Sequence, residues 1–169
     1  MPVVYISVGS NLGNRYKNIK KALTKIKNVA KIIKISSIYL TSPTENFNQP
    51  NFYNCVIKIN TKLKPSELLT KLKEIEKMLG RNFYTKRYQP RIIDLDILFY
   101  GKKIIKKKNL VIPHKKLHKR KFVLWPLNEI ASNFVHPVFK KKIFNIKKML
   151  EFNKGQKIKL LIPAYKVKF

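Results

Sequence analysis

The chain has 169 residues, 44% of them hydrophobic, which predicts one globular domain over residues 1–169 with its own core. Lys and Arg number 38 against 8 Asp and Glu, and the resulting net charge of +30 is typical of a solvated lysine surface or of attraction to polyanions. A single cysteine, Cys55, excludes an internal disulfide, and the lack of a ~20-residue apolar run or a signal-peptide pattern predicts a cytoplasmic protein without a membrane segment.

The first hundred residues alternate between strand-like and helix-like patterns. Continuous apolar runs indicate buried strands, and apolar residues three and four positions apart indicate helices. Pro65 suits the first turn of a helix, and Gly80 suits a helix C-terminus. The predicted elements are a strand at 3–8, a helix at 16–30, strands at 31–40 and 52–61, a helix at 65–79 and a strand at 91–100. This order predicts an α+β fold with a ferredoxin-like βαββαβ core and a mainly antiparallel sheet.

Beyond residue 101 the pattern is weaker. Pro113 and Pro126 break the apolar pieces of residues 102–131, where we expect irregular structure with short helices. Residues 140–169 form a basic C-terminal extension to which the sequence assigns no role. Within it, residues 141–150 are compatible with a short helix and residues 156–162 with a strand.

Asp94 and Asp96 are the only aspartates, and both interrupt the apolar strand at 91–100. On a strand, residues two positions apart point to the same face, about 7 Å apart, so the two carboxylates share a face. The opposite, apolar face is predicted to consist of Ile93, Leu95, Ile97 and Phe99. Neighbouring carboxylates repel, so the pair requires a cation unless it lies at an exposed strand end. Arginine ion pairs and magnesium bound together with substrate phosphates are the two cationic alternatives.

Arginines gather just upstream of the aspartates. Arg81, Arg87 and Arg91 lie in or beside the loop that leads into the strand, although lysine is the common cation of this chain. They could form ion pairs with the aspartates or clamp a triphosphate. Three arginines exceed what two aspartates need, which favours the clamp. Glu76 is either a surface partner of a lysine or a member of the same site.

Several motifs appear together with the aspartate pair. They are GSNLGNR at 9–15, FYNCV at 52–56, IEKMLGR at 75–81, KRYQPRIIDLDIL at 86–98 and IPHKKLHKRKFVLWPL at 112–127. From about residue 3 to about residue 139 the chain resembles the 6-hydroxymethyl-7,8-dihydropterin pyrophosphokinases of folate biosynthesis. The resemblance implies transfer of the β,γ-pyrophosphoryl group of ATP to the hydroxymethyl oxygen of the pterin, with release of AMP. It also implies two Mg²⁺ ions, a ferredoxin-like α+β fold and a monomer.

The resemblance further implies roles for individual residues. Phe52 and Phe122 would sandwich the pterin ring, and its edge would be recognised by Thr41, Ser42, Thr44, Asn54 and Asp94. The ATP site would be formed by Leu69, Lys73, Glu76, Arg81, Arg91, Ile97, Leu110, Val111, His114 and Arg120. Asp94 and Asp96 would hold the magnesium ions, and the catalytic residues would be Asp96, Arg81 and Arg91. A loop that closes over ATP would include Arg87 and Tyr88.

Three positions of the closing loop depart from the family pattern. Tyr88 stands where a tryptophan is usual, Gln89 where a small residue is usual, and Phe83 where an arginine is frequent. We expect these changes to affect loop closure and rate rather than the type of reaction. Without the resemblance, Phe52 would be assigned to the core and His114 to the surface.

Three other functions share parts of this pattern. An RNA-binding module of the RRM class has the same element order and would suit the positive charge, but the chain lacks the aromatic stretch of such modules, and two aspartates would repel phosphate. We therefore expect no specific nucleic-acid partner. An acylphosphatase-like hydrolase has a similar topology without a need for the aspartate pair. A degenerate pyrophosphokinase that keeps the fold but reacts slowly is the third alternative.

Overall fold

A computed structural model describes residues 1–44, 48–82, 89–151 and 155–169. Within these residues a six-stranded sheet runs in the order β5-β1-β4-β3-β8, and β2 pairs with β4 next to β3. Every pairing between these strands is antiparallel. The strands are β1 (Val3–Ser10), β2 (Lys31–Ile35), β3 (Ile38–Thr41), β4 (Phe52–Asn60), β5 (Asp94–Tyr100) and β8 (Ile158–Ile162). The expectation of a mainly antiparallel sheet in a mixed α and β fold is confirmed.

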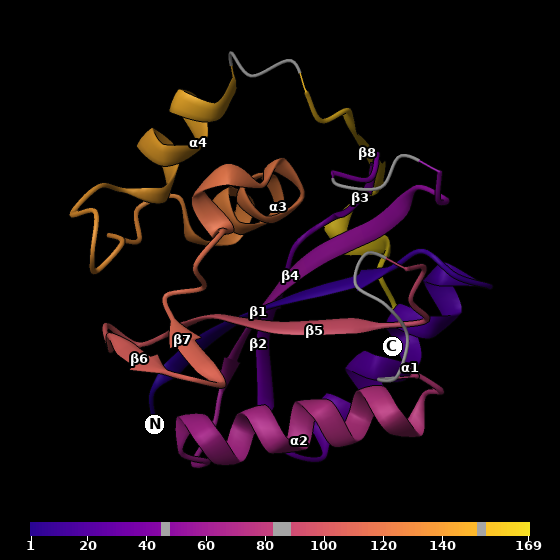
Figure 1. Ribbon diagram of the computed structural model, residues 1–169, viewed down its shortest axis with the longest axis horizontal. Coiled ribbons are helices and arrows are strands. Elements are labelled where there is room, and N and C mark those ends of the chain that lie inside the picture. Colours follow the sequence, from indigo (N-terminus) through magenta and orange to yellow (C-terminus); the bar gives the residue numbers. More distant parts are fainter. Residues whose placement is uncertain (45–47, 83–88, 152–154) are drawn as a thin grey trace.

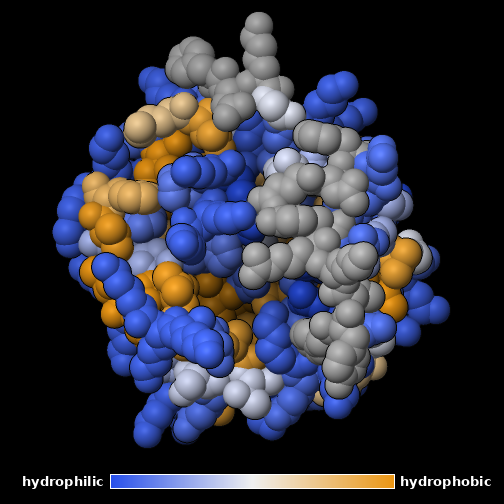
Figure 2. All heavy atoms as spheres, viewed as in Figure 1, coloured by the Kyte–Doolittle hydropathy of each residue, from blue (hydrophilic) through white to orange (hydrophobic). Residues whose placement is uncertain are grey.

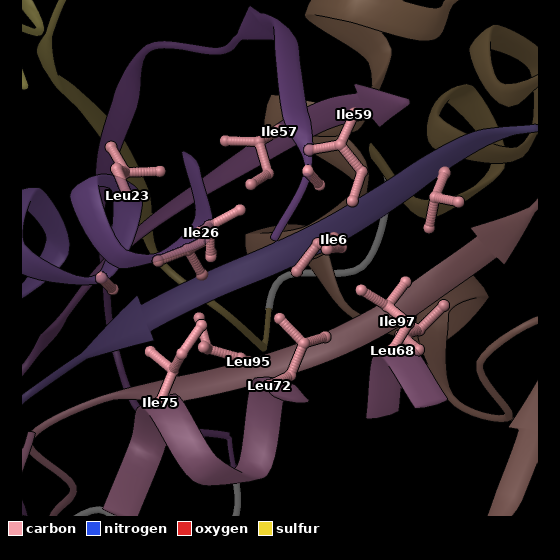
Figure 3. Packing of buried hydrophobic residues seen from close by; sticks show 14 of the residues in the cluster. Ile6, Leu23, Ile26, Ile57, Ile59, Leu68, Leu72, Ile75, Leu95 and Ile97 are labelled. Atoms are coloured by element: carbon pink, nitrogen blue, oxygen red, sulfur yellow. The ribbon is translucent and has the colours of Figure 1, made fainter. Parts of the chain in front are cut away.

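Two helices, α1 (Arg15–Lys27) and α2 (Pro65–Met78), cover one face of the sheet (Figure 1). The Asn14 side chain accepts the backbone N–H of Lys17 at 2.9 Å and so caps the start of α1. Between these helices and the sheet lies the larger apolar cluster, part of which Figure 3 shows. Its labelled members, all buried, are Ile6, Leu23, Ile26, Ile57, Ile59, Leu68, Leu72, Ile75, Leu95 and Ile97.

The other face of the sheet is covered by α3 (Lys121–Ala131), against which α4 (Ile143–Glu151) packs (Figure 1). A second apolar cluster, which contains Val56, Phe99 and Leu124, fills the space between them and the sheet. The remaining elements are the hairpin of β6 (Ile105–Lys107) and β7 (Leu110–Ile112) and two 3₁₀ turns at Leu117–Lys119 and Ala164–Lys166. Within the described residues, no helix combines the length and apolar character needed to span a bilayer.

The surface carries the lysine excess. Figure 2 shows hydrophilic side chains over much of one face of the molecule, with apolar patches between them. The large apolar side chains that remain exposed include Val135, Val138, Phe139, Phe144 and Met149, all in or near α4.

The predicted strand at 31–40 is two strands, β2 and β3, separated at Ser36 and Ser37. Both serines are buried. The Ser36 hydroxyl accepts the backbone N–H of Val56 at 2.9 Å, while the backbone N–H of Ser37 turns away from the sheet and donates to the Glu129 carboxylate of α3. The Ser36 backbone N–H still donates to the Val56 carbonyl at 2.9 Å, whereas at Ser37 a helix side chain takes the place of the strand pairing.

The apolar face predicted for the strand at 91–100 is wrong at one residue. Leu95 and Ile97 pack in the cluster below the sheet, but Phe99 packs in the cluster on the opposite side, with α3. A register shift between Tyr5 and Ile6 of β1 accounts for this, because β5 has an extra residue opposite them. Such a bulge inverts the alternation of side chains beyond it.

The C-terminal part is more regular than predicted. Residues 102–131 contain the β6–β7 hairpin and an eleven-residue helix, α3, that includes Pro126. The short helix and the strand expected within residues 140–169 are confirmed as α4 and β8. Strand β8 pairs with β3, so the basic extension completes the main sheet.

Candidate active site

Asp94 and Asp96 lie on β5, on the face of the sheet that α3 covers, where both line one pocket. In the β1–β5 register, Asp94 is opposite Gly9 and Asp96 is opposite Ser7. Their side chains are 23% and 35% exposed, so neither carboxylate is fully shielded from solvent. The strand periodicity predicted this shared face.

Asp94 is held between two arginines. Arg81 Nη1 donates to Oδ1 of Asp94 at 2.5 Å, and Arg91 Nη1 donates to Oδ2 at 2.9 Å. Burial raises the pKa of Asp94, but the charges of the two arginines and of Lys73 outweigh that effect, so its pKa lies below the ordinary value. Asp94 is therefore ionised at neutral pH and fixes both guanidinium groups beside the pocket.

Asp96 has weaker compensation of its charge. The His114 imidazole lies beside it, with Nε2 4.0 Å from Oδ2 of Asp96. Burial and then the charge of Asp94 raise the pKa of Asp96, and burial lowers the pKa of His114 in spite of Asp96. Asp96 thus lies where an added cation would be favourable.

The two aspartates are an incomplete cation site by themselves. No group of three or more His, Cys, Asp and Glu side chains in the described ranges could hold a metal ion. Magnesium, however, is commonly bound through one or two carboxylates together with substrate phosphates and water. The chemistry of this donor pair therefore fits Mg²⁺ that arrives with a phosphate-bearing substrate.

Glu76 is fully buried, so its interpretation as a surface partner of a lysine is wrong. Its Oε1 accepts the backbone N–H of Leu95 at 2.6 Å and lies 2.6 Å from Nη1 of Arg81. Lys73 Nζ, one helical turn away, is 3.0 Å from the same carboxylate. Burial raises the pKa of Glu76 even though Lys73 and Arg81 lower it. Glu76 connects α2 to β5 and to Arg81.

The pocket beside the aspartates is lined by polar and aromatic side chains from six segments of the chain. Phe52 and Asn54 come from β4, Arg120 and Phe122 from the start of α3. The other lining residues are Ser7, Gly9, Ser42, Pro43, Thr44, Gln49, Gln89, Arg91, Asp94, Asp96 and Gln156. A hollow with two phenylalanines, an amide and a carboxylate pair suits a flat, polar heterocycle.

Asn54 is held in place by its neighbours. Its Nδ2 donates to Oγ1 of Thr41 at 2.7 Å, and the residue is only 3% exposed. A Cβ on Gly9 would lie 2.5 Å from Oδ1 of Asn54, closer than carbon and oxygen can approach. Glycine at position 9 therefore permits the orientation of the Asn54 amide.

The structure brings together most of the predicted pterin residues and only part of the predicted ATP residues. Arg91 and Arg120 line the pocket, and Arg81 reaches its wall through Asp94. The other predicted ATP residues do not line it; these are Leu69, Lys73, Glu76, Ile97, Leu110, Val111 and His114. Ile97 is 4% exposed and packs in the cluster below the sheet. The predicted closing-loop residues Arg87 and Tyr88, with Phe83, lie outside the described residues.

Sequence reasoning missed several residues of this site. Asn11 accepts the backbone N–H of Arg91 at 2.7 Å and donates to Gln49 and to the Pro50 carbonyl, so it joins the β1 turn to two loops. The sequence feature that could have identified Asn11 is its position in the GSN turn, directly after a buried strand. Gln156 carried no local signal, because it belongs to the extension to which no role was assigned.

The sequence of this chain is similar to those of known proteins over most of its length. The family model of 7,8-dihydro-6-hydroxymethylpterin-pyrophosphokinase (HPPK) matches residues 5–132. The chain belongs to this family. It is 43% identical over 147 residues to 2-amino-4-hydroxy-6-hydroxymethyldihydropteridine pyrophosphokinase of Aquifex aeolicus, covering 87% of this chain and 91% of that protein. The corresponding Haemophilus influenzae protein is 41% identical over 81% of this chain and 86% of its own length.

Longer relatives are matched over a part of their length. The folic acid synthesis protein fol1 of Pneumocystis carinii is 50% identical over 80% of this chain, which spans 18% of that protein. Among solved structures, Plasmodium falciparum HPPK-DHPS wild type with SDX-DHP has a TM-score of 0.73 at 18% identity and covers 93% of this chain and 47% of its own. That likeness shows a shared fold.

Proposed function

We propose that this chain transfers the pyrophosphoryl group of ATP to the hydroxymethyl oxygen of 6-hydroxymethyl-7,8-dihydropterin, which yields the pterin diphosphate and AMP in folate biosynthesis. The observation that carries this proposal is the aspartate pair of β5, which lines one pocket with Phe52 and Phe122 and in which Asp94 binds two arginines. The family membership and the near full-length similarity to the Aquifex enzyme support it.

The pterin would occupy the pocket next to the aspartates. Phe52 and Phe122 would pack on the two sides of the ring, where aromatic contacts contribute on the order of 1 kcal/mol beyond burial. Asn54, fixed by Thr41, would present its amide to the ring edge together with the backbone of residues 41–44. In this position the hydroxymethyl group would approach the carboxylates of β5.

The triphosphate would lie against the arginines. Arg81 and Arg91 are already held by Asp94, and phosphate oxygens would share their donors. Arg120 and His114 would contribute on the opposite side, while adenosine would contact Leu69, Lys73, Leu110 and Val111, with the buried Glu76 and Ile97 behind them. Arg87 and Tyr88 would belong to the loop that closes over ATP and excludes water.

Mg²⁺ would be held by Asp94 and Asp96, and we propose two ions. Bound there, magnesium would neutralise negative charge on the phosphates. Asp96 lines the pocket, so it is the side chain best placed to help activate the attacking hydroxyl, directly or through its metal. Arg81 and Arg91 would stabilise the charge that develops on the phosphate chain.

Four further features belong to the proposal. We assign the core to the ferredoxin-like class, which the element order from β1 to β5 and the antiparallel sheet support. We also propose that residues 1–169 act as one domain, that the protein is a monomer and that it works in the cytoplasm without a specific nucleic-acid partner.

The decisive experiment measures AMP formation by the purified protein with ATP, Mg²⁺ and 6-hydroxymethyl-7,8-dihydropterin. AMP should appear only when the pterin and Mg²⁺ are both present, and an Asp96→Asn variant that keeps the wild-type circular dichroism should lose this activity. Release of free phosphate would indicate a hydrolase instead. A folded wild type that binds neither substrate would contradict the proposed function, whereas binding of ATP without turnover would indicate a degenerate enzyme.

A further inference from the structure

Gln156 lies outside the part of the chain that matches the family model, yet it lines the pocket proposed for the pterin. It lies two residues before β8, and its two hydrogen-bond partners are 34 and 114 residues away along the chain. Its Nε2 donates to the backbone carbonyl of Ser42 at 3.0 Å. Its Oε1 accepts the backbone N–H of Phe122 at 3.2 Å. One carboxamide therefore joins two walls of the pocket.

The bond to Phe122 gives an acceptor to a backbone N–H group at the start of α3. Phe122 is in the first turn of α3, where backbone N–H groups have no acceptor within the helix. Arg120 occupies the N-cap position and supplies no side-chain hydrogen bond to the helix. Gln156 supplies an acceptor from a distant segment, so it fixes the start of the helix that carries the Phe122 ring.

The bond to Ser42 is part of a longer connection. Ser42 donates its backbone N–H to the Lys157 carbonyl at 3.0 Å, and its hydroxyl accepts the Lys157 N–H at 3.0 Å. Strand β8 then continues the pairing with β3, with Ile158 opposite Thr41. The wall formed by residues 42–44 is thus tied to the same short segment that holds Phe122.

We propose that Gln156 is a positioning residue of the pterin pocket, which sets the distance between the Phe122 ring and the wall at residues 42–44. This inference rests on the proposed function, because it takes that pocket as the pterin site. An amide suits the position because it needs a donor toward Ser42 and an acceptor toward Phe122. Within the described residues, the hydrogen bonds of the Gln156 side chain reach Phe122 and Ser42 rather than the arginines or Asp96, so the effect should concern the pterin rather than ATP.

Two variants test the position. Gln156→Met keeps the approximate length of the side chain but removes both hydrogen bonds. Gln156→Glu keeps the acceptor toward Phe122 and places an oxygen against the Ser42 carbonyl. Lys159→Ala is the matched control, because Lys159 is an exposed residue of β8 opposite Leu40. All four proteins are compared by thermal unfolding before binding is measured.

The measurement is equilibrium binding of 6-hydroxymethyl-7,8-dihydropterin, with α,β-methylene-ATP and Mg²⁺ present, beside the KM for ATP and kcat. Loss of one or two hydrogen bonds should raise the pterin Kd about tenfold in Gln156→Met and Gln156→Glu. The KM for ATP should stay within about twofold of the wild type. Lys159→Ala should bind the pterin like the wild type.

Other results would overturn the inference. Wild-type pterin affinity in both Gln156 variants would show that the carboxamide does not position the pocket. Equal weakening of ATP and pterin binding, together with a lower unfolding temperature, would assign Gln156 a general structural role. If the wild-type protein itself does not bind the pterin, the proposed function fails and the inference fails with it. The wild type is measured first, so this failure is distinguished from a failure of the inference alone.

Discussion

Glu76 accepts the backbone N–H of Leu95, the residue between the two aspartates, at 2.6 Å. The same oxygen lies 2.6 Å from Nη1 of Arg81. A single buried carboxylate of α2 thus fixes the position of β5 relative to α2 and orients Arg81, which binds Asp94. The geometry of the proposed active site depends on a residue that does not face its pocket.

We expect Glu76→Gln to change the free energy of unfolding by less than about 1 kcal/mol, because an amide oxygen can still accept from Leu95 and burial already disfavours the charge. Glu76→Leu should cost about 1–3 kcal/mol, because the Leu95 N–H would then be buried without an acceptor. Urea unfolding of both variants checks this. Glu74→Ala is the control, since the exposed Lys71–Glu74 pair should contribute little. Equal losses in the two Glu76 variants would contradict the prediction.

Gly9→Ala should weaken pterin binding. The added methyl group would lie 2.5 Å from Oδ1 of Asn54, so the amide must rotate and give up its bond to Thr41. We expect a pterin Kd about tenfold higher, in line with the loss of about one hydrogen bond. Gly13→Ala is the control: Gly13 has φ +64 and open space around it, so that substitution should lower stability by about 1 kcal/mol and leave pterin affinity unchanged. Equal pterin affinity in the two variants would contradict this reading.

His136 should make stability depend on pH. Burial, and next the charge of His118, lowers the pKa of His136 to about 4, while the unfolded chain titrates near its ordinary 6.5. The folded protein therefore disfavours the protonated ring, and stability present above pH ~6.5 is lost as the pH falls toward ~4. We expect this residue to account for about 2 kcal/mol of lost stability between pH 7 and pH 5.

Urea unfolding at the two pH values measures the effect of His136. A His136→Asn variant keeps an acceptor for the backbone N–H groups of Val138 and Phe139 but does not titrate in this range. It should be less stable at pH 7, because the stacking on Phe139 is lost, yet its stability should fall less on acidification. A His118→Asn variant should retain most of the wild-type dependence. Parallel pH profiles of the wild type and His136→Asn would refute the prediction.

Glu129→Gln should weaken the hydrogen bonds that join α3 to Ser37 and to Tyr39 of β3. The Glu129 carboxylate accepts from the backbone N–H and hydroxyl of Ser37 and from the Tyr39 hydroxyl at 3.1 Å. Burial and the Glu129 charge raise the pKa of Tyr39 to about 12. Removal of the charge should lower the pKa of Tyr39, although burial still holds it above the ordinary value, and ultraviolet titration of tyrosinate would detect the change. The weaker hydrogen bonds should cost about 1–2 kcal/mol of stability. The Tyr39→Phe variant identifies which titration step belongs to Tyr39.

The sequence predicted the elements that depend on local patterns. The strands at the N-terminus and around residue 55, both helices below the sheet, and the shared face of Asp94 and Asp96 follow from apolar periodicity, which the structure bears out. Phe99 was assigned to the wrong face, because a bulge leaves no mark in the order of apolar residues. Ser36 and Ser37 end a strand through bonds to Val56 and Glu129, which no local window contains.

The site could be predicted only in part. Phe52 and Phe122 were chosen through the family resemblance, since an aromatic residue in a strand or helix is otherwise a core candidate. The burial of Glu76 could not be predicted, because helical spacing does not show whether a residue at the edge of the apolar stripe is buried or exposed. Gln156 could not be found, because its two partners are 114 and 34 residues away along the chain. Gln156 reaches the pocket only when β8 is paired with β3.

The pairing of β8 also leaves one outer edge of the sheet open. Among the residues that the structure describes, no strand pairs with the far side of β8, and its Leu160 and Leu161 are exposed. An open edge of this kind can recruit strands of other molecules into aggregates, and charged lysines are a common defence. Lys157 and Lys159 stand on or beside this edge, so part of the lysine excess would keep molecules apart, and this protection should weaken as added salt screens the charges.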